Sequence, residues 1–244
     1  MVTPSFRSDS LPDTPYEQDG LRSVHNHDFM RDEGFLRSYQ RGVVAAGEDY
    51  RWHWRVHVGL WAAHTAHMLE GDFVECGVNR GFLSSSIMES LDWDKLGKTF
   101  YLLDTFHGLS PSVVSPGMYG ERELLRNEQN IENGFYTDDF SSVEKNFSSW
   151  KNIRLVKGVI PESLSEVSAT SLAFLHLDLN CAPPEVAAFD YFWPKLVHGG
   201  IVLFDDYAYC GYEGQKYAMD RCVEKYETKI LSLPTGQGLL IKTN

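Results

Sequence analysis

Residues 71–81 read GDFVECGVNRG, and this stretch predicts a buried strand, a glycine turn and the start of a helix over 82–91. Gly77 and Gly81 allow the backbone to approach a ligand closely and leave a helix N-terminus facing it. The spacing is E-x-G-x-x-x-G, which differs from the G-x-G-x-x-G of dinucleotide binders. Because Glu75 stands at the end of the strand, we expect its carboxylate to face the cationic part of a ligand.

Strands and helices alternate on the C-terminal side of this turn. Strands are expected over 99–103, 153–156, 172–177 and 201–204, and helices over 141–150, 162–167, 185–193 and 216–226. The segments 230–233 and 238–242 flank a PTGQ turn and predict a terminal hairpin. Such alternation is typical of α/β proteins. We therefore predict a Rossmann-like, doubly wound, mostly parallel sheet with an antiparallel C-terminal strand.

The N-terminal part lies outside this pattern. Residues 1–19 are rich in Ser, Pro and Asp and are expected to form an arm without a core of its own, and 21–69 read as helical with breaks at two glycines. We expect an arm and helices over 1–70 as an elaboration of one α/β domain over 71–244. Within that domain, 110–139 form a long insertion containing a polar helix candidate, and such insertions usually act as lids.

Composition limits the class of protein. The 244 residues are 43% hydrophobic and carry a formal net charge of -12, which disfavours nucleic acid and anionic membranes as partners. The sequence shows no signal peptide and no run of about 20 apolar residues. The cysteines are scattered, which fits reduced thiols: Cys76, Cys181, Cys210 and Cys222. We therefore expect a cytoplasmic protein.

Three aspartates follow two of the predicted strands. Asp178 comes directly after 172–177, and Asp205 and Asp206 come directly after 201–204. The carboxyl ends of parallel strands share one crevice, where these carboxylates would repel each other. A hard cation such as Mg²⁺ relieves that repulsion, and no Lys or Arg stands immediately beside them in the sequence. The alternative interpretation is two helix N-caps and a surface acid.

A further aspartate, Asp104, ends the second strand. Doubly wound folds place an acid there that accepts hydrogen bonds from ribose hydroxyls. A turn-forming aspartate is the alternative. The glycine turn, Asp104 and the three later acids occur in order, which is more specific than any one of them.

These stretches resemble one known family. GDFVECGVNRG looks like the first motif of class I S-adenosylmethionine-dependent methyltransferases, and in particular of the macrocin, mycinamicin and novobiocin sugar O-methyltransferases. Further segments similar to that family are LDTFHGL at 103–109, KGVIPESL at 157–164, Asp178, HGG at 198–200, DDY at 205–207 and Met219-Asp220. The match covers about residues 69–220 in the right order.

The resemblance implies S-adenosylmethionine as cofactor. It implies that the donor is held by Glu75, Gly77, Val78, Asn79, Gly81, Asp104 and Thr105, with Gly158 and Val159 near the adenine. It also implies that Asp178, Asp205 and Asp206 bind a divalent metal, Mg²⁺ or another, which holds two neighbouring sugar hydroxyls. Two departures concern the acceptor side. Asn180 stands where the family usually has an acid, and APPE at 182–185 replaces a Y-x-[ST]-T-like stretch.

We predict a metal-dependent O-methyltransferase that acts on a sugar hydroxyl of a glycan or glycosylated metabolite. A bound cation lowers the pKa of the hydroxyl, and Asp178 takes its proton. His107, in the loop after the second strand, is a rival general base. Tyr207 and Tyr209 are expected to contact the substrate. We also expect a homo-oligomer.

Three other functions stay open at this point. The same metal site would suit a catechol-like diol as acceptor. A non-catalytic S-adenosylmethionine-binding protein has only the Asn180 change in its favour. An NAD-dependent oxidoreductase is disfavoured by the glycine spacing.

The histidines have a simpler interpretation. We expect four of them to form the polar flank of an amphipathic helix rather than a second metal site: His53, His57, His64 and His67. His176 lies inside a predicted strand and is expected to be a satisfied core residue.

Overall fold

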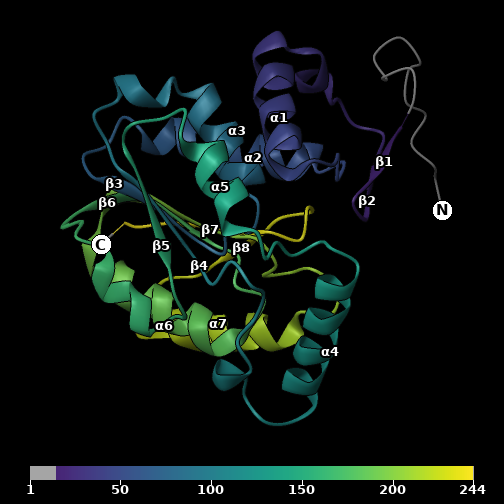
Figure 1. The fold of residues 1–244 in the computed structure, drawn as a ribbon, viewed down its shortest axis with the longest axis vertical. Helices are drawn as coiled ribbons and strands as arrows, with labels where there is room; N and C mark the ends of the chain where they lie inside the picture. The colour runs from purple at the N-terminus through teal and green to yellow at the C-terminus, as the bar shows by residue number, and fades with distance from the viewer. Residues whose placement is uncertain (1–14, 244) are drawn as a thin grey trace.

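The computed structural model describes residues 15–243, in which a seven-stranded sheet lies between two layers of helices (Figure 1). The strand order is β5-β4-β3-β6-β7-β9-β8, with parallel pairing from β5 to β7 and antiparallel pairing of β9 with β7 and β8. The strands are β3 Asp72–Cys76, β4 Phe100–Asp104, β5 Ile153–Lys157, β6 Leu172–Leu177, β7 Leu196–Phe204, β8 Leu231–Ser232 and β9 Gly238–Ile241. The predicted sheet, including its antiparallel C-terminal strand, is confirmed.

The helices cover both faces of the sheet. They are α1 Glu33–Ala46, α2 His53–Ala66, α3 Phe82–Ser90, α4 Met118–Glu132, α5 Phe140–Phe147, α6 Ala182–Phe192 and α7 Glu213–Glu224. Successive residues of β3 pack on opposite faces of the sheet. Phe73 belongs to the hydrophobic cluster with α1, α2 and α3, and Val74 belongs to the cluster with α6. A central parallel strand is covered on both faces, and in β3 every residue from Phe73 to Cys76 is buried, including Glu75. The segment 162–167, predicted as a helix, forms a 3-10 turn over Glu162–Glu166.

Backbone hydrogen bonds keep the carboxyl ends of the central strands level. The Asp178 N–H donates to the carbonyl of Cys76 at 2.8 Å, and the Asp205 N–H donates to that of Leu177 at 2.9 Å. The strand ends of β3, β6 and β7 therefore meet at one edge of the sheet. This register brings the acids predicted at those ends into one region.

The N-terminal region differs from the prediction. Instead of continuing as a helix from residue 21, it begins with a hairpin, β1 Tyr16–Gln18 and β2 Leu21–Ser23. Asp19 and Gly20 both have positive φ, 51° and 71°, which is the conformation of a two-residue type I′ turn. An Asp-Gly pair is the sequence signal for such a turn. Most of the predicted arm, residues 1–14, lies outside the described residues.

The N-terminal helices pack directly on the sheet domain. α1 contacts α3, and α2 contacts α3 and β7. The helices α1, α2 and α3 thus belong to one layer. The predicted boundary at residue 70, between the N-terminal elaboration and the α/β domain, stays a prediction. None of the helices in residues 15–243 is long and apolar enough to cross a membrane.

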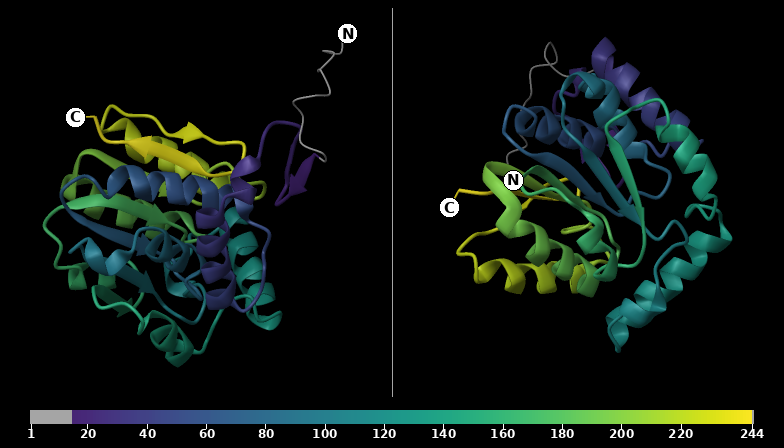
Figure 2. Two further views of the ribbon diagram at one scale, coloured as in Figure 1. Left: turned by 90° about the horizontal axis from the view of Figure 1, so that it is seen from above. Right: turned by 60° about the vertical axis from the view of Figure 1, so that its left-hand side comes forward.

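The insertion over 110–139 contains the predicted polar helix, α4. Figure 2 shows α4 standing at the periphery of the molecule, away from the sheet. The four cysteines are free thiols, as expected, and Cys210 is the exposed one.

Candidate active site

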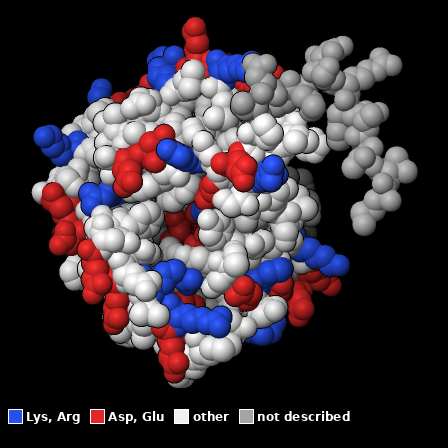
Figure 3. All heavy atoms as spheres, turned by 90° about the vertical axis from the view of Figure 1, so that its right-hand side faces the viewer, with Lys and Arg blue, Asp and Glu red and all other residues white. Residues whose placement is uncertain are grey.

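A cavity of about 370 Å³ opens at the carboxyl edge of the sheet. Figure 3 shows a hollow on this side of the molecule with acidic atoms on its floor. Of the residues predicted from the sequence, those that line the cavity are Glu75, Gly77, Val78, Asn79, Asp104, Thr105, Gly158, Val159, Asp178, Asp205, Asp206 and Tyr209. The fold therefore gathers the predicted donor side and acceptor side in one place.

The glycine turn after β3 is fixed by its neighbours. A Cβ on Gly77 would lie 1.8 Å from the carbonyl oxygen of Asp178, so only glycine fits beside the end of β6. The N–H groups of Val78 and Asn79 both donate to Oδ2 of Asp104 at 2.7 Å. Asp104 thus ties the turn to the end of β4. Oδ1 accepts from the Phe106 N–H at 2.7 Å and from the Thr105 hydroxyl at 3.3 Å, so both oxygens of Asp104 are engaged within the protein.

Glu75 and His176 form a buried pair on one face of the sheet. They are partners in the β3–β6 register, with His176 Nδ1 2.9 Å from Glu75 Oε1. Burial by itself lowers the pKa of His176, but the neighbouring carboxylates of Asp205 and Glu75 raise it to about 10. Only Glu75 is within hydrogen-bond distance, because His176 Nε2 lies 3.8 Å from Asp205 and has no hydrogen-bond partner among residues 15–243. The other oxygen, Glu75 Oε2, is buried and has no hydrogen-bond partner among residues 15–243. An unpartnered carboxylate oxygen in a cavity wall suits a cationic ligand group such as an ammonium.

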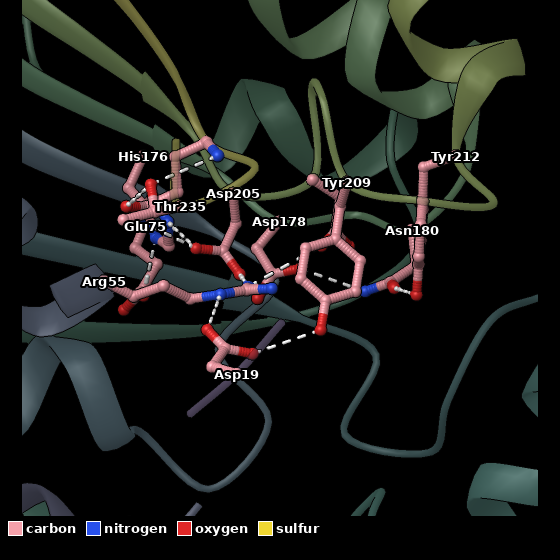
Figure 4. A network of polar contacts seen from close by, with 12 residues as sticks. Asp19, Arg55, Glu75, His176, Asp178, Asn180, Asp205, Tyr209, Tyr212 and Thr235 are labelled. Carbon is pink, nitrogen blue, oxygen red and sulfur yellow. Dashed lines mark hydrogen bonds and ion pairs between the residues drawn. The ribbon is translucent and has the colours of Figure 1, made fainter. Parts of the chain in front are cut away.

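The acids after β7 are paired with an arginine from α2. Arg55 Nη1 forms an ion pair with Asp205 Oδ2 and lies 3.6 Å from Asp206 Oδ1 (Figure 4). Its Nε donates to Asp19 Oδ2 at 2.9 Å. Burial alone lowers the pKa of Arg55, but Asp205 and Asp206 raise it above its usual value. The guanidinium is therefore a fixed positive charge in the site.

This arrangement does not fit a metal held by the three predicted aspartates. Asp205 Oδ2 is bound to Arg55, and Oδ1 accepts from Gln237 Nε2 at 3.1 Å and lies 3.8 Å from His176 Nε2. Over residues 15–243, no group of three or more His, Cys, Asp or Glu side chains is arranged to hold a metal ion. The sequence showed no basic neighbour because Arg55 lies 150 residues from Asp205 in the chain.

Asp178 occupies the acceptor side of the cavity. Asn180 Nδ2 donates to Asp178 Oδ1 at 3.0 Å, and the hydroxyl of Tyr212 donates to Asn180 Oδ1 at 2.9 Å. Burial, followed by the charges of Asp205 and Asp206, raises the pKa of Asp178 well above its usual value. Asn180 therefore orients Asp178.

Three predicted site residues do not line the cavity. His107 is exposed in the loop after β4, where its backbone N–H donates to Thr105 Oγ1 at 3.2 Å. Tyr207 is buried, with its hydroxyl bound to Asp220 and to Lys216 Nζ on α7. Gly81 caps the start of α3 with a φ of 83°. Direct roles for His107 and Tyr207 thus find no support in this geometry.

The histidines of α2 take part in aromatic packing. His53 stacks on Tyr39 with ring centroids 4.4 Å apart, and His57 stacks on Phe29 at 4.0 Å. His64 Nε2 lies 2.8 Å from Ser90 Oγ. They pack against the surrounding helices, and no metal cluster forms there among the residues described.

Residues 60–230 match the family described as Macrocin-O-methyltransferase (TylF). A demethyldecarbamoylnovobiocin O-methyltransferase from Streptomyces niveus is 27% identical over 216 residues, which cover 82% of this chain and 78% of the relative. An 8-demethyl-8-(2,3-dimethoxy-alpha-L-rhamnosyl)-tetracenomycin-C 4'-O-methyltransferase from Streptomyces olivaceus is 30% identical over 145 residues, which cover 57% of this chain and 53% of the relative.

A solved structure shares the fold. The O-methyltransferase NovP superposes with a TM-score of 0.71 at 21% sequence identity, covering 87% of this chain and all of that one. The match confirms the methyltransferase form of the Rossmann-like fold predicted from the sequence.

Proposed function

Because the chain belongs to the macrocin O-methyltransferase family, we propose that it methylates a sugar hydroxyl of a glycosylated metabolite, with S-adenosylmethionine as the donor. The single observation that carries the proposal is the cavity in which Glu75, Asp104 and Asp178 meet. The family match supports the reaction, and the name of the relative from Streptomyces olivaceus, which contains a rhamnosyl group, supports a glycosylated acceptor. A non-catalytic role is not supported, because the chain retains the family's acids.

The donor is proposed to lie over the glycine turn that follows β3, beside the carboxyl end of β4. Glu75 Oε2 is available to the ammonium of its methionine part, and Asp104, which lines the same cavity, is proposed to lie beside its ribose. Gly158, at the end of β5, has no room for a side chain, because a Cβ would lie 2.7 Å from that of Ser163. A flat adenine fits against such a surface. The donor supplies an electrophilic methyl group, and the protein has to place the acceptor oxygen in line with it.

Asp178 is proposed as the general base. It lies in the cavity wall at the end of β6, between the donor turn and Tyr212. The amide of Asn180 occupies Oδ1 and leaves Oδ2 for the acceptor hydroxyl. A sugar hydroxyl holds its proton far above neutral pH, so a positioned carboxylate that accepts it lowers the barrier.

Tyr209 is proposed to contact the sugar ring, since it lines the cavity beside Arg55. A catechol-like acceptor remains the second candidate, but it was inferred from chelation by the three aspartates. The engagement of Asp205 by Arg55 and Gln237 removes that chelation, and the rhamnosyl group in the name of the relative from Streptomyces olivaceus favours the sugar. The Mg²⁺ expected from the sequence does not fit these acids as they are paired, and the proposed reaction does not require it.

The test combines binding and turnover. Calorimetry should show binding of S-adenosylmethionine and none of NAD. Asp178→Asn should retain donor affinity and lose roughly 10²–10⁴ in turnover of a glycosylated acceptor, the usual range for a general base. Asp190→Asn, which changes an acid paired with Lys225 on the outer helices, is the matched control and should turn over normally. Full activity in Asp178→Asn would contradict the assignment of the base.

A further inference from the structure

The guanidinium of Arg55 lies beside two of the three carboxylates that the sequence predicts as metal ligands, Asp205 and Asp206. Its Nη1 touches Oδ2 of Asp205 and lies 3.6 Å from Oδ1 of Asp206 (Figure 4). The remaining oxygen of Asp205 accepts from Gln237 at 3.1 Å. Both oxygens of this acid are therefore engaged by protein donors.

The rest of the Arg55 side chain is held from other directions. Asp19, at the tip of the β1–β2 hairpin, accepts from its Nε at 2.9 Å. The guanidinium carbon lies 4.5 Å from the ring centre of Tyr209 and 5.4 Å from that of Trp52. The Arg55 side chain is only 8% exposed. Moving it aside would break the pair with Asp19 and leave buried carboxylates uncompensated.

We propose that Arg55 is the resident cation of this acidic cluster and takes the role of a divalent metal. A guanidinium stays charged at every working pH and presents five donors in a plane. A divalent ion bound a few ångströms from it would be repelled, since both are cations in a poorly solvated site. Arg55 thus both neutralises the acids and keeps a metal out.

Arg55 also lines the cavity, so its charge lies on the acceptor side. A fixed cation there stabilises the negative charge that develops on the hydroxyl oxygen as its proton leaves. This second role rests on the proposed function. The assignment of Arg55 as the resident cation does not.

Direct titration with Mn²⁺, followed by electron paramagnetic resonance, tests the cation assignment. Wild type and Arg55→Lys, which keeps the charge, should bind Mn²⁺ weakly. Arg55→Gln removes the charge at similar length and should bind it at least roughly tenfold more tightly. Arg41→Gln is the matched control: Arg41 bonds to the carbonyl of Asn146 and stacks on Trp150, outside the cavity, and its loss should leave Mn²⁺ binding unchanged.

Equal and tight binding of Mn²⁺ by wild type and Arg55→Gln would overturn the proposal. If Arg55→Gln does not fold, tight Mn²⁺ binding by the wild type alone overturns the proposal, and weak binding by wild type and Arg55→Lys supports it.

Turnover is the second readout. The wild type should keep its rate in EDTA, and a rate lost in EDTA and restored by Mg²⁺ would also overturn the proposal. If no acceptor is methylated under any condition, the proposed function fails while the Mn²⁺ titration still decides the role of Arg55.

Discussion

Glu75 uses its two carboxylate oxygens for different partners. Oε1 pairs with His176, which holds the side chain in place, and Oε2 is left without a partner in the cavity wall. A buried acceptor without a partner costs stability unless a ligand satisfies it. This residue is therefore organised for a bound cationic group, and a substitution that keeps its shape isolates the role of its charge.

Glu75→Gln should weaken binding of S-adenosylmethionine. The loss of one charge-assisted hydrogen bond is worth ~1.5–3 kcal/mol, which is roughly 10- to 150-fold in affinity. Calorimetry on the folded variant measures it. Glu89→Gln, which alters an acid paired with Arg37 on the helical surface at 3.6 Å, should bind the donor as the wild type does. Unchanged affinity in Glu75→Gln would argue against the placement of the donor over the turn.

The buried side chain of Glu185 should make the stability of the fold depend on pH. It is fully buried in the first turn of α6, where burial raises its pKa from 4.5 to about 8. The folded state then holds the proton more tightly than the unfolded state. The stabilisation is fully present below pH 4.5 and is lost as the pH rises towards 8. The free energy of unfolding should fall in that window by up to about 1.4 kcal/mol per pH unit.

Glu185→Gln removes the titrating group and keeps a partner for Gln215 Nε2, which donates to the glutamate at 2.5 Å. Urea unfolding of wild type and variant at several pH values measures the difference. The variant should gain stability relative to the wild type as the pH rises towards 8. Parallel pH profiles for the two proteins would show that Glu185 ionises normally.

At the scale of elements, two segments outside the sheet complete the site. The β1–β2 hairpin carries Asp19 to Arg55, and the hydroxyl of Tyr209 donates to the same aspartate at 3.1 Å. On the other side, Arg126 of α4 bonds to the carbonyl of Gly211 at 3.2 Å. Its guanidinium lies 3.7 Å from the ring centre of Tyr212. The β1–β2 hairpin and α4 thus border the cavity, and these side-chain contacts hold them there.

The insertion over 110–139 should act as a lid over the acceptor. Its helix α4 stands at the periphery and is held to the loop before α7 by Arg126. Limited proteolysis within 110–139 should slow when donor and acceptor are both bound. Arg126→Ala should be cleaved faster than the wild type without ligands. Arg122→Ala, an exposed neighbour on the same helix, is the control, and identical cleavage with and without ligands would speak against a lid.

At the scale of the whole molecule, the sequence predicted the parts of the fold that depend on local pattern. β4, β6 and the second half of β7 read as largely apolar runs because they are buried, and the acids at their ends followed from the topology. The pairing of Arg55 with Asp205 could not be foreseen, since nothing local marks a contact between residues so distant in the chain. The hairpin turn at Asp19 was missed although Asp-Gly is a known signal, because the flanking strands have only three residues each.

The expected homo-oligomer stays a prediction, and α1 and α2 offer a candidate interface. Large apolar side chains are exposed on α1 at Leu36 and Val44 (66%), on α2 at Trp61, and just after α2 at Met68 (78%). Exposed apolar patches are typical of protein interfaces. Light scattering should therefore give a mass that is a multiple of 27.8 kDa.

Trp61→Glu should shift that assembly towards the monomer, because it places a charge in the expected interface. Tyr217→Glu is the control, since Tyr217 is similarly exposed, at 52%, but lies on α7 on the opposite layer of helices. It should leave the mass unchanged. Donor binding, measured in parallel, shows whether each variant is folded. A monomeric wild type at the highest concentration tested would contradict the prediction, and a mass that changes equally in both variants would place the interface elsewhere.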